Sequence, residues 1–410
     1  MTVEDYDKRE RQAVTELPNR VVEMVSPVTF ASEGYPSRVR SDAELWKYLD
    51  VMHETRFERD LNRLFQGALS PEEFTQLRRV AENACGASQA LFGRKLTVRG
   101  SLLPALNVFR HIADIFQGTP TRVFEIGPGS GCLGSLFILN GWSYAATDIA
   151  QAFYLIQNRV WDHAAGGRLE DLAGGSVWDG KLEPRRPLHF PWWEFFKLLD
   201  QEPLMVDVVT CNHALAEMHA NSLAFSLRVA RRMLRGGGIK AFVFEGWGFE
   251  KFHPRSAITK KFYECGFRLV HNDDLITVFA PDDADCATPA ARLPRFGVPV
   301  EFGLPPVIGP ARSHSSHRSR SGWSALKAIL GSQEFLAGFR ELVRSLAYLP
   351  PQSSSNGNIV SGRIFAGRQR RLTGDRIPLA AIEDFYAELL GSKDLRTADE
   401  KFLRAIDRTY

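Results

Sequence analysis

Residues 123–131 read VFEIGPGSG, and this stretch decides the predicted fold. The first four residues have the apolar pattern of a short buried strand, and Gly127, Gly129 and Gly131 follow at once. Residues 133–139 are then apolar enough for a buried helix. Glycines let the backbone approach a ligand closely, and amides at the start of a helix are donors that favour anionic or polar groups. The stretch therefore predicts a strand, a ligand-binding loop and a helix in succession.

The same alternation continues on both sides of this loop. The pattern predicts strands at residues 122–126, 142–147, 188–190, 205–211, 239–245, 267–271 and 275–280. Between them it predicts helices at residues 133–139, from about 150 to 163, at 221–234 and at about 255–264, whereas residues 165–186 have an irregular composition. Strands that alternate with helices indicate an open, largely parallel sheet of the α/β class.

Two interpretations of the glycines compete. Gly129-x-Gly131-x-x-Gly134 fits the fingerprint of a dinucleotide-binding fold. In the other register, Glu125-x-Gly127-x-Gly129-x-Gly131, the first glycine directly follows the strand, and an acid stands at the end of that strand. A carboxylate there would sit poorly beside a pyrophosphate, but it could pair with an ammonium group. Asp148 ends the next predicted strand, where a carboxylate can accept hydrogen bonds from both hydroxyls of a ribose.

With these two acids in place, residues 119–282 resemble the core of a class I S-adenosylmethionine (SAM)-dependent methyltransferase. The turn Arg235-Gly236-Gly237-Gly238 and a final hairpin joined at Asp273-Asp274 are similar to that family as well. The resemblance implies a Rossmann-like sheet of seven strands with a terminal antiparallel hairpin, SAM as cofactor and S-adenosylhomocysteine (SAH) as product. The cofactor-binding residues that it implies are Glu125, Gly127, Pro128, Gly129, Ser130, Gly131, Asp148, Ile149, Phe153, His189 and Asn212.

Two shorter segments resemble sugar O-methyltransferases. They are residues 212–218 (NHALAEM) and residues 190–193 (FPWW). This finer likeness implies that the methyl group goes to a hydroxyl of a sugar or of another small polar molecule.

The predicted fourth strand ends at Asn212 and His213, where an open α/β sheet binds its ligands. Methyl transfer to a hydroxyl releases a proton, and a neutral imidazole can accept it near pH 7. We therefore predict His213 as a general base. If a helix begins there, Glu217 shares its face and could orient the imidazole or bind the substrate. The alternative is that His213 caps the helix and Glu217 is solvated.

Glu245 ends the predicted fifth strand and faces the same edge of the sheet, so we predict that it binds polar groups of the substrate. Trp247 could form a flat wall of that site, or pack on the core. Residues 189–196 (HFPWWEFF) form the densest aromatic cluster, which could line the adenine or substrate pocket or attach a crossover helix to the sheet.

The composition is that of a globular protein. The chain has 410 residues, 44% of them hydrophobic, and a net charge of only +3, which argues against a dedicated nucleic-acid binder. Five scattered cysteines without CxxC spacing predict neither a disulfide framework nor a metal site, and fit the reducing cytoplasm. The charged N-terminus lacks the apolar core of a secretory signal, and no apolar run reaches the length of a membrane span. We expect a small-molecule substrate, no membrane or nucleic-acid partner, and leave a homodimer open.

The chain divides into four predicted parts. Residues 1–118 read as a helical lid or substrate domain, with helices at 42–65 and 102–116 and a capped helix start at Ser70. Residues 119–282 are the core, 283–324 a linker or arm, and 325–410 a mostly helical extension with a strand at 359–365. The basic stretches 312–320 and 368–371, with Arg376, could contact phosphates or be solvated.

Transfer of a methyl group by in-line displacement is the function that these patterns favour. A second enzyme class, cyclisation or cleavage of SAM itself, needs the same loop with a different arrangement of bases. A nucleic-acid methyltransferase is disfavoured, because Asn212-His213-Ala214-Leu215 stands where an amide-binding Asn-Pro-Pro-Tyr tetrad would follow the fourth strand. A scaffold without activity is disfavoured by the intact acids and glycines.

Overall fold

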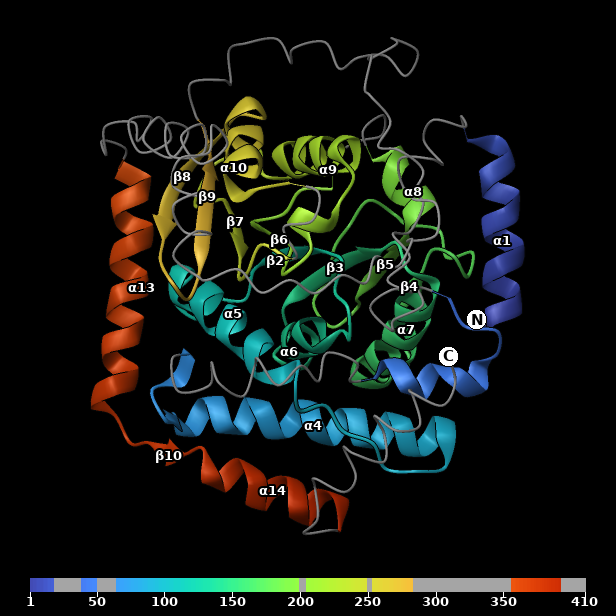
Figure 1. The fold of residues 1–410 in the computed structure, drawn as a ribbon, viewed down its shortest axis with the longest axis horizontal. Helices are drawn as coiled ribbons and strands as arrows, with labels where there is room; N and C mark the ends of the chain where they lie inside the picture. The colour runs from blue at the N-terminus through green and yellow to red at the C-terminus, as the bar shows by residue number, and fades with distance from the viewer. Residues whose placement is uncertain (18–37, 50–63, 199–203, 249–252, 283–354, 392–410) are drawn as a thin grey trace, which may run out of the picture. The chain divides into compact units, whose positions relative to one another are not determined.

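The structure is a computed structural model, shown in Figure 1. It describes residues 1–17, 38–49, 64–198, 204–248, 253–282 and 355–391. The chain divides into one unit formed by residues 1–281 and 354–410 and a second formed by 282–353. The helices and strands of the described ranges all belong to the first unit.

Eight strands form one sheet at the centre of this unit. They are β2 (Arg122–Ile126), β3 (Ser143–Asp148), β4 (Glu170–Asp171), β5 (Leu188–Pro191), β6 (Val208–Thr210), β7 (Ala241–Phe244), β8 (Phe267–Asn272) and β9 (Thr277–Pro281). Their order is β4-β5-β3-β2-β6-β7-β9-β8. All pairs from β4 to β7 are parallel, whereas β9 runs antiparallel to both of its neighbours. The order reverses at β2, so the loops after β2, β3 and β6 meet at one edge of the sheet.

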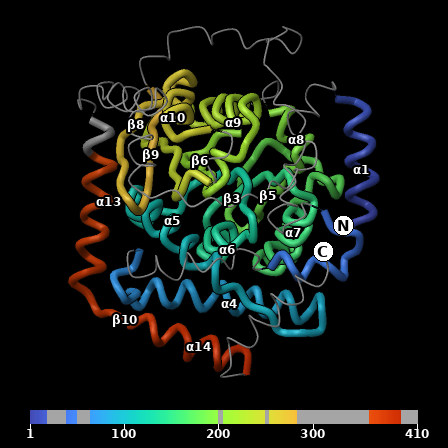
Figure 2. The backbone as a smooth tube through the Cα atoms, in the orientation of Figure 1, coloured from blue at the N-terminus to red at the C-terminus, as the bar shows by residue number. Residues whose placement is uncertain are grey.

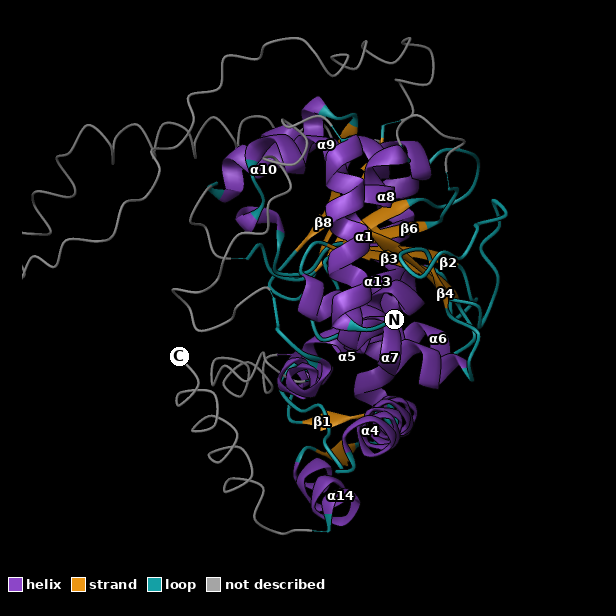
Figure 3. Cartoon of the chain, turned by 90° about the vertical axis from the view of Figure 1, so that its right-hand side faces the viewer, coloured by secondary structure: helices purple, strands orange, loops and turns teal. Residues whose placement is uncertain are grey.

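Helices cover both faces of the sheet. One layer consists of α5 (Leu102–Ile115), α6 (Cys132–Leu139) and α7 (Gln151–Ala165). The other consists of α8 (Trp192–Lys197), α9 (Ala220–Met233) and α10 (Arg255–Glu264). Figure 3 shows the two layers on opposite sides of the strands. Because helices bury both faces, central strands such as β2 and β3 are buried almost without interruption.

This architecture confirms the predicted Rossmann-like fold of a class I methyltransferase, including the terminal hairpin of β8 and β9. All seven expected strands are present. The eighth, β4, lies in a segment predicted to be irregular. It pairs with β5 because the backbone of Glu170 donates to Pro187 at 2.8 Å and that of Leu172 donates to His189 at 3.1 Å.

The N-terminal part contains α1 (Val3–Glu16), the 3-10 helix η2 (Asp42–Tyr48), β1 (Ala68–Leu69) and α4 (Pro71–Phe92). The helix start predicted at Ser70 is confirmed, since its side chain accepts from the backbone of Glu73 and Glu73 returns the bond. The helix predicted over 42–65 is described only at its ends, because residues 50–63 lie outside the described ranges.

The C-terminal part contains α13 (Ser355–Thr373), β10 (Ile377–Pro378) and α14 (Ala380–Leu390). Figure 2 shows these segments in red next to the blue-green helices of the N-terminal part. There α13 lies beside α5, and α14 lies beside α4. Strand β10 pairs with β1, Ala68 opposite Pro378. None of the helices in the described ranges combines the length and the apolar character that crossing a membrane requires.

The strand predicted at residues 359–365 is wrong, because this segment belongs to α13. Val360 and Ile364 are four residues apart and buried, as on one face of a helix. That face packs against α5 and β8. The apolar residues on either side of this pair misled the prediction, since Ile359 and Phe365 are exposed.

Candidate functional site

The glycine loop follows β2 with three left-handed residues. The φ angles of Gly127, Gly129 and Gly131 are +67°, +58° and +75°, a region that residues with a β-carbon rarely adopt. A β-carbon on Gly131 would lie 3.0 Å from the indole nitrogen of Trp161. One on Gly129 would meet no described atom within 4 Å. The loop is therefore tight against the core at Gly131 and open at Gly129.

Two side chains of α7 donate hydrogen bonds to carbonyls of the loop. The amide of Gln157 donates to the carbonyl of Gly129 at 2.6 Å and to the Asp148 carboxylate at 2.8 Å. The indole of Trp161 donates to the carbonyl of Gly131 at 2.9 Å. Gln157 thus ties the glycine loop to the acid at the end of the neighbouring strand.

Asp148 lies at the end of β3, beside the loop. The two strands are parallel, with Ile126 opposite Thr147, so their C-terminal ends meet. Its side chain accepts from the backbone of Ala150 at 2.9 Å and is 5% exposed. Burial raises the pKa of Asp148 to about 6, although hydrogen bonds from Ala150 and Gln157 oppose the increase.

Glu125 lies in β2, directly before the loop, and is 2% exposed. It accepts a hydrogen bond from the hydroxyl of Tyr144 at 2.7 Å. Burial raises the pKa of Glu125 to about 7, against the effect of hydrogen bonds from Tyr144 and Asn212. Its carboxylate is therefore sensitive to any positive charge brought to the loop.

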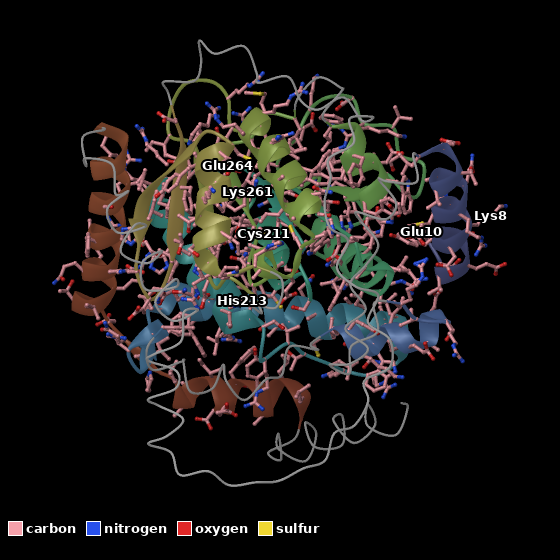
Figure 4. All side chains as sticks on the ribbon, turned by 45° about the horizontal axis from the view of Figure 1, so that its top comes forward. Lys8, Glu10, Cys211, His213, Lys261 and Glu264 are labelled. Atoms are coloured by element: carbon pink, nitrogen blue, oxygen red, sulfur yellow. The ribbon has the colours of Figure 1, made fainter. Side chains whose placement is uncertain are left out.

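His213 follows β6 in a strained conformation. Its φ is +54°, unusual for a residue with a side chain, and its backbone N–H points at the carbonyls of Glu245 and Gly246, at 3.2 and 3.3 Å. A β-carbon on Gly246 would lie 2.1 Å from Nδ1 of His213, so only glycine admits the imidazole there. Figure 4 labels His213 and Cys211 at this end of β6. Strain of this kind concentrates at functional sites.

The helix that was expected to place Glu217 on the face of His213 does not begin there. Residues 215–217 form the short 3-10 helix η3, and α9 begins at Ala220 with His219 as its cap. The left-handed backbone of His213 is incompatible with a helix. Glu217 nevertheless lies near the loop that packs on His213. A β-carbon on Gly248 in that loop would be 3.1 Å from the Glu217 carboxylate and 2.4 Å from the carbonyl oxygen of His213.

Glu245 lies at the end of β7 and is 7% exposed. Its carboxylate accepts from the side-chain amide of Asn107 on α5 at 3.2 Å. Its backbone N–H donates to the side chain of Asn212 at 3.0 Å. The side chains of Asn212, His213 and Glu245 thus come from two adjacent strand ends, as predicted from their places in the sequence.

The remaining predicted residues differ in position. His189 is fully buried, stacked on Tyr154 at 3.9 Å, and its Nδ1 lies 2.6 Å from Asn158. Burial lowers the pKa of His189 well below its usual value. This position indicates that His189 packs in the core and does not line a ligand pocket. Phe153 packs edge-on against Tyr48, 5.4 Å between centroids.

Around the loop itself, the accessibility of the predicted residues varies. Gly127, Pro128, Gly129 and Ile149 are partly exposed, and Ser130 is 5% exposed with its Oγ 3.4 Å from the sulfur of Cys132. Trp247 packs edge-on against Phe244 at 4.9 Å, while its backbone carbonyl accepts from Ala216 at 2.7 Å.

Arg368 and Arg371 make internal ion pairs, whereas Arg376 donates to the backbone carbonyls of Phe65 and Ala68 at 2.7 and 2.9 Å. Arg371 binds Asp114 through two nitrogens at 2.9 and 2.7 Å, and Arg368 binds Asp273 at 2.6 Å. Nε of Arg368 also donates to Nε2 of His111 at 3.0 Å, so His111 is neutral there and its Nδ1 donates to the carbonyl of Asn107. These contacts, which we call the α13 clamp, join α13 to α5 and to the β8–β9 turn. The stretch 312–320 lies outside the described residues.

Sequence reasoning missed the residues that support the loops. Tyr144, Gln157, Trp161 and Asn107 each bond to a loop or to a predicted site residue, but each lies on a buried strand or helix face. The sequence pattern assigned those faces to the core, and it carries no signal that separates a supporting polar side chain from a packed one.

Comparison with known proteins adds little to this geometry. No protein-family model matches the chain, and neither does any curated protein. Among solved structures, it is similar to Burkholderia thailandensis 1,6-didemethyltoxoflavin-N1-methyltransferase, bound to 1,6-didemethyltoxoflavin and SAH, with 16% identity over 52% of this chain and 91% of that one and a TM-score of 0.30. It is also similar to magnesium protoporphyrin IX methyltransferase from Synechocystis PCC 6803 with bound SAM, with 13% identity over 60% and 99% and a TM-score of 0.29.

A third structure, PigF with SAH, is 14% identical over 55% of this chain and 72% of that one, with a TM-score of 0.29. At these scores the fold assignment rests on the strand order of the chain itself.

Proposed function

We propose that this protein is a SAM-dependent methyltransferase that acts on a hydroxyl of a small polar acceptor. The observation that carries the proposal is the pairing of the open position at Gly129 with the carboxylate of Asp148, joined by Gln157. A glycine loop with room for a ligand beside an acid that can accept from a ribose diol suits an adenosyl group better than a pyrophosphate.

The residues present fit SAM on both of its halves. Asp148 would bind the ribose hydroxyls, and Glu125 would attract the ammonium of the methionyl part. The glycine loop leads into α6, whose first backbone amides have no carbonyl partner within the helix and can donate to a ligand. The amides of Gly127 and Gly131 shape the loop itself, since they donate to the carbonyls of Thr147 and Pro128. When bound, SAM supplies a sulfonium methyl group, and its transfer leaves SAH.

The acceptor would bind at the ends of β6 and β7. His213 would take the proton of the attacking hydroxyl through its imidazole, which makes the oxygen a better nucleophile. Glu245 and Glu217 would bind other polar groups of the acceptor, and Asn107 would hold Glu245 in place. The likeness of residues 190–193 and 212–218 to sugar O-methyltransferases supports a small, carbohydrate-like molecule as the acceptor. We place the protein in the cytoplasm, without a membrane or nucleic-acid partner.

Calorimetric titration with SAM and SAH tests the proposal directly. We expect both to bind wild-type protein, and neither to bind a variant that combines Asp148→Ala with Gly129→Trp. Asp179→Ala with Gly180→Trp is the matched control, because it makes the same changes at an exposed turn. Failure of wild-type protein to bind either compound would overturn the proposal.

Incubation with SAM alone, followed by mass spectrometry, separates methyl transfer from chemistry on SAM itself. A small product derived from SAM without any acceptor would replace our proposal by cyclisation or cleavage. With an acceptor found by screening polyhydroxylated compounds, His213→Ala should lower kcat by about 10²–10⁴-fold, the usual contribution of a general base.

A further inference from the structure

Helix α1 carries a buried hydroxyl for which the described part of the chain supplies no partner. The side chain of Tyr6 is 0% exposed, and its oxygen makes no hydrogen bond to any residue in the described ranges. Buried hydroxyls are nearly always hydrogen-bonded, so each exception calls for a ligand, a water or a functional reason. Tyr6 is therefore a candidate for contact with something the protein binds.

Two hydrogen bonds made by neighbours of Tyr6 on α1 hold this part of the helix beside the ends of β3 and β5. Its sequence neighbour Asp7 accepts from the amide of Gln151, the first residue of α7 and the third after Asp148. One turn further along α1, Glu10 accepts from the indole of Trp192 at 2.8 Å, directly after Pro191. Pro191 and Asp148 are paired in register across the two strands.

The same face of α1 turns toward the sheet. Val3, Tyr6 and Glu10 are its buried residues, and Figure 4 shows Glu10 facing the body of the unit while Lys8 points away. The oxygen of the same Gln151 amide accepts a hydrogen bond from the backbone N–H of Val39 at 2.9 Å. Helix α1 and the segment around Val39 are thus both bonded to Gln151, at the start of α7.

The ring of Tyr6 is held by aromatic contacts that leave only its hydroxyl to be satisfied. Its centroid lies 5.3 Å from that of Tyr154 and 5.1 Å from that of Trp193. Burial raises the pKa of Tyr6 well above its usual value, and the charges of Glu10 and Asp148 act in the same direction. The phenol therefore keeps its proton and is available as a donor, within electrostatic reach of the Asp148 carboxylate.

From this placement we infer that Tyr6 is a cofactor-binding residue, whose hydroxyl donates a hydrogen bond to an oxygen of the ribose diol of SAM. Asp148 accepts from that diol, so donor and acceptor meet the ribose from two elements. The inference rests on the proposed function, because it names a further contact in the same adenosyl site.

The test compares Tyr6→Phe with wild-type protein in calorimetric titrations with SAH. Loss of one hydrogen bond should weaken SAH binding by roughly tenfold. The analogue of SAH that carries a 2′,3′-dideoxyribose should bind both proteins equally, because it lacks the oxygens that Tyr6 would contact. Tyr386→Phe is the matched control. It removes a phenol hydroxyl that donates to the carbonyl of Val98, away from the loop, and should leave SAH affinity unchanged.

Thermal unfolding without ligand gives a second readout. Because the hydroxyl has no described partner, its removal should raise Tm of the ligand-free protein, whereas Tyr386→Phe should lower it. A purely structural role of Tyr6 would lower Tm and leave SAH affinity unchanged, which would overturn the inference.

Equal weakening of SAH and the dideoxy analogue by Tyr6→Phe would overturn the assignment to the ribose. Binding of SAH by neither protein would instead refute the proposed function, so the two failures are distinguishable.

Discussion

Buried carboxylates occur in two regions of this molecule, and the two regions treat them differently. Beside the glycine loop, Glu125 and Asp148 receive hydrogen bonds from neutral donors, and burial raises their pKa values to about 7 and about 6. In the α13 clamp, Asp114 and Asp273 are bound by arginines. Burial raises the pKa of Asp114 there too, although Arg371 opposes the increase. At the half-buried Asp273, hydrogen bonds from His271 and Arg368 outweigh burial and hold the pKa well below its usual value.

The difference separates two uses of a buried charge. A carboxylate that an arginine already neutralises can fasten a helix, and it has no charge left to offer a ligand. A carboxylate with only neutral donors has no counter-ion of its own, so it can pair with a cationic group of a ligand. This comparison supports the proposal that the loop acids bind a ligand, whereas the acids under α13 hold the fold together.

Breaking the clamp should have the largest effect. Arg371→Met removes the partner of Asp114, whose side chain is 6% exposed, and leaves a buried charge uncompensated. We expect the free energy of unfolding to fall by about 3–5 kcal/mol, measured by urea denaturation.

Arg370→Met is the control on the same helix, because Arg370 is 70% exposed and lies 3.8 Å from Asp114. It should change stability by less than about 0.5 kcal/mol. Equal losses in the two variants would mean that the clamp acts through general charge and not through the buried pair.

At the loop, the expected effect depends on pH. The pKa of Glu125 is about 7 in the folded protein, against a usual value of 4.5. Its contribution to stability is therefore complete below pH 4.5 and is lost as the pH rises through 7. Glu125→Gln cannot ionise, so it should exceed wild-type stability by about 3 kcal/mol at pH 8 and match it near pH 4.5.

Denaturation of both proteins at these two pH values checks this expectation. Glu82→Gln, at an exposed position paired with Arg78, should show no such dependence. If Glu125→Gln were no more stable at pH 8, the carboxylate would have a compensating cation and the contrast between the two regions would fail.

Close packing in the clamp predicts a smaller loss for Gly367→Ala. A β-carbon there would lie 1.9 Å from a carboxylate oxygen of Asp114, which Arg371 holds from the other side. Because the oxygen cannot retreat without weakening the ion pair, we expect a loss of about 1–3 kcal/mol in urea denaturation.

Gly362→Ala should have the smallest effect and the opposite sign. It lies in the same helix, and its β-carbon would meet no described atom within 4 Å. Alanine is the better helix former, so stability should rise by about 0.5–1 kcal/mol. If both variants lost stability, α13 would be sensitive to any substitution, and the loss at Gly367 could not be attributed to its contact with Asp114.

The sequence predicted the sheet well, because buried parallel strands and their glycine turns are local patterns. Residues 122–126 and Asp148 came out as expected for this reason. The terminal hairpin was also predicted from its short turn. Strand β4 was not, since two residues carry no periodic signal and its pairing depends on β5.

Tertiary contacts decided what the sequence could not. Residues 359–365 form a helix because α5 and β8 cover Val360 and Ile364, and neither partner is near them in the sequence. Arg368 and Arg371 read as a basic surface, since their acidic partners lie on distant elements. At the site, the position of His213 at a strand end was foreseen, whereas its left-handed backbone, set by the contact with Gly246, was not.

The α13 clamp has a consequence for how the protein is made. Asp114 precedes Arg371 by 257 residues. At ribosomal rates of about 5–20 residues per second, the acid leaves the ribosome roughly 13–50 seconds before its partner. During that interval α5 exposes the apolar and acidic face that α13 will cover. The nascent sheet can form, but this face of α5 stays open until α13 has left the ribosome as well.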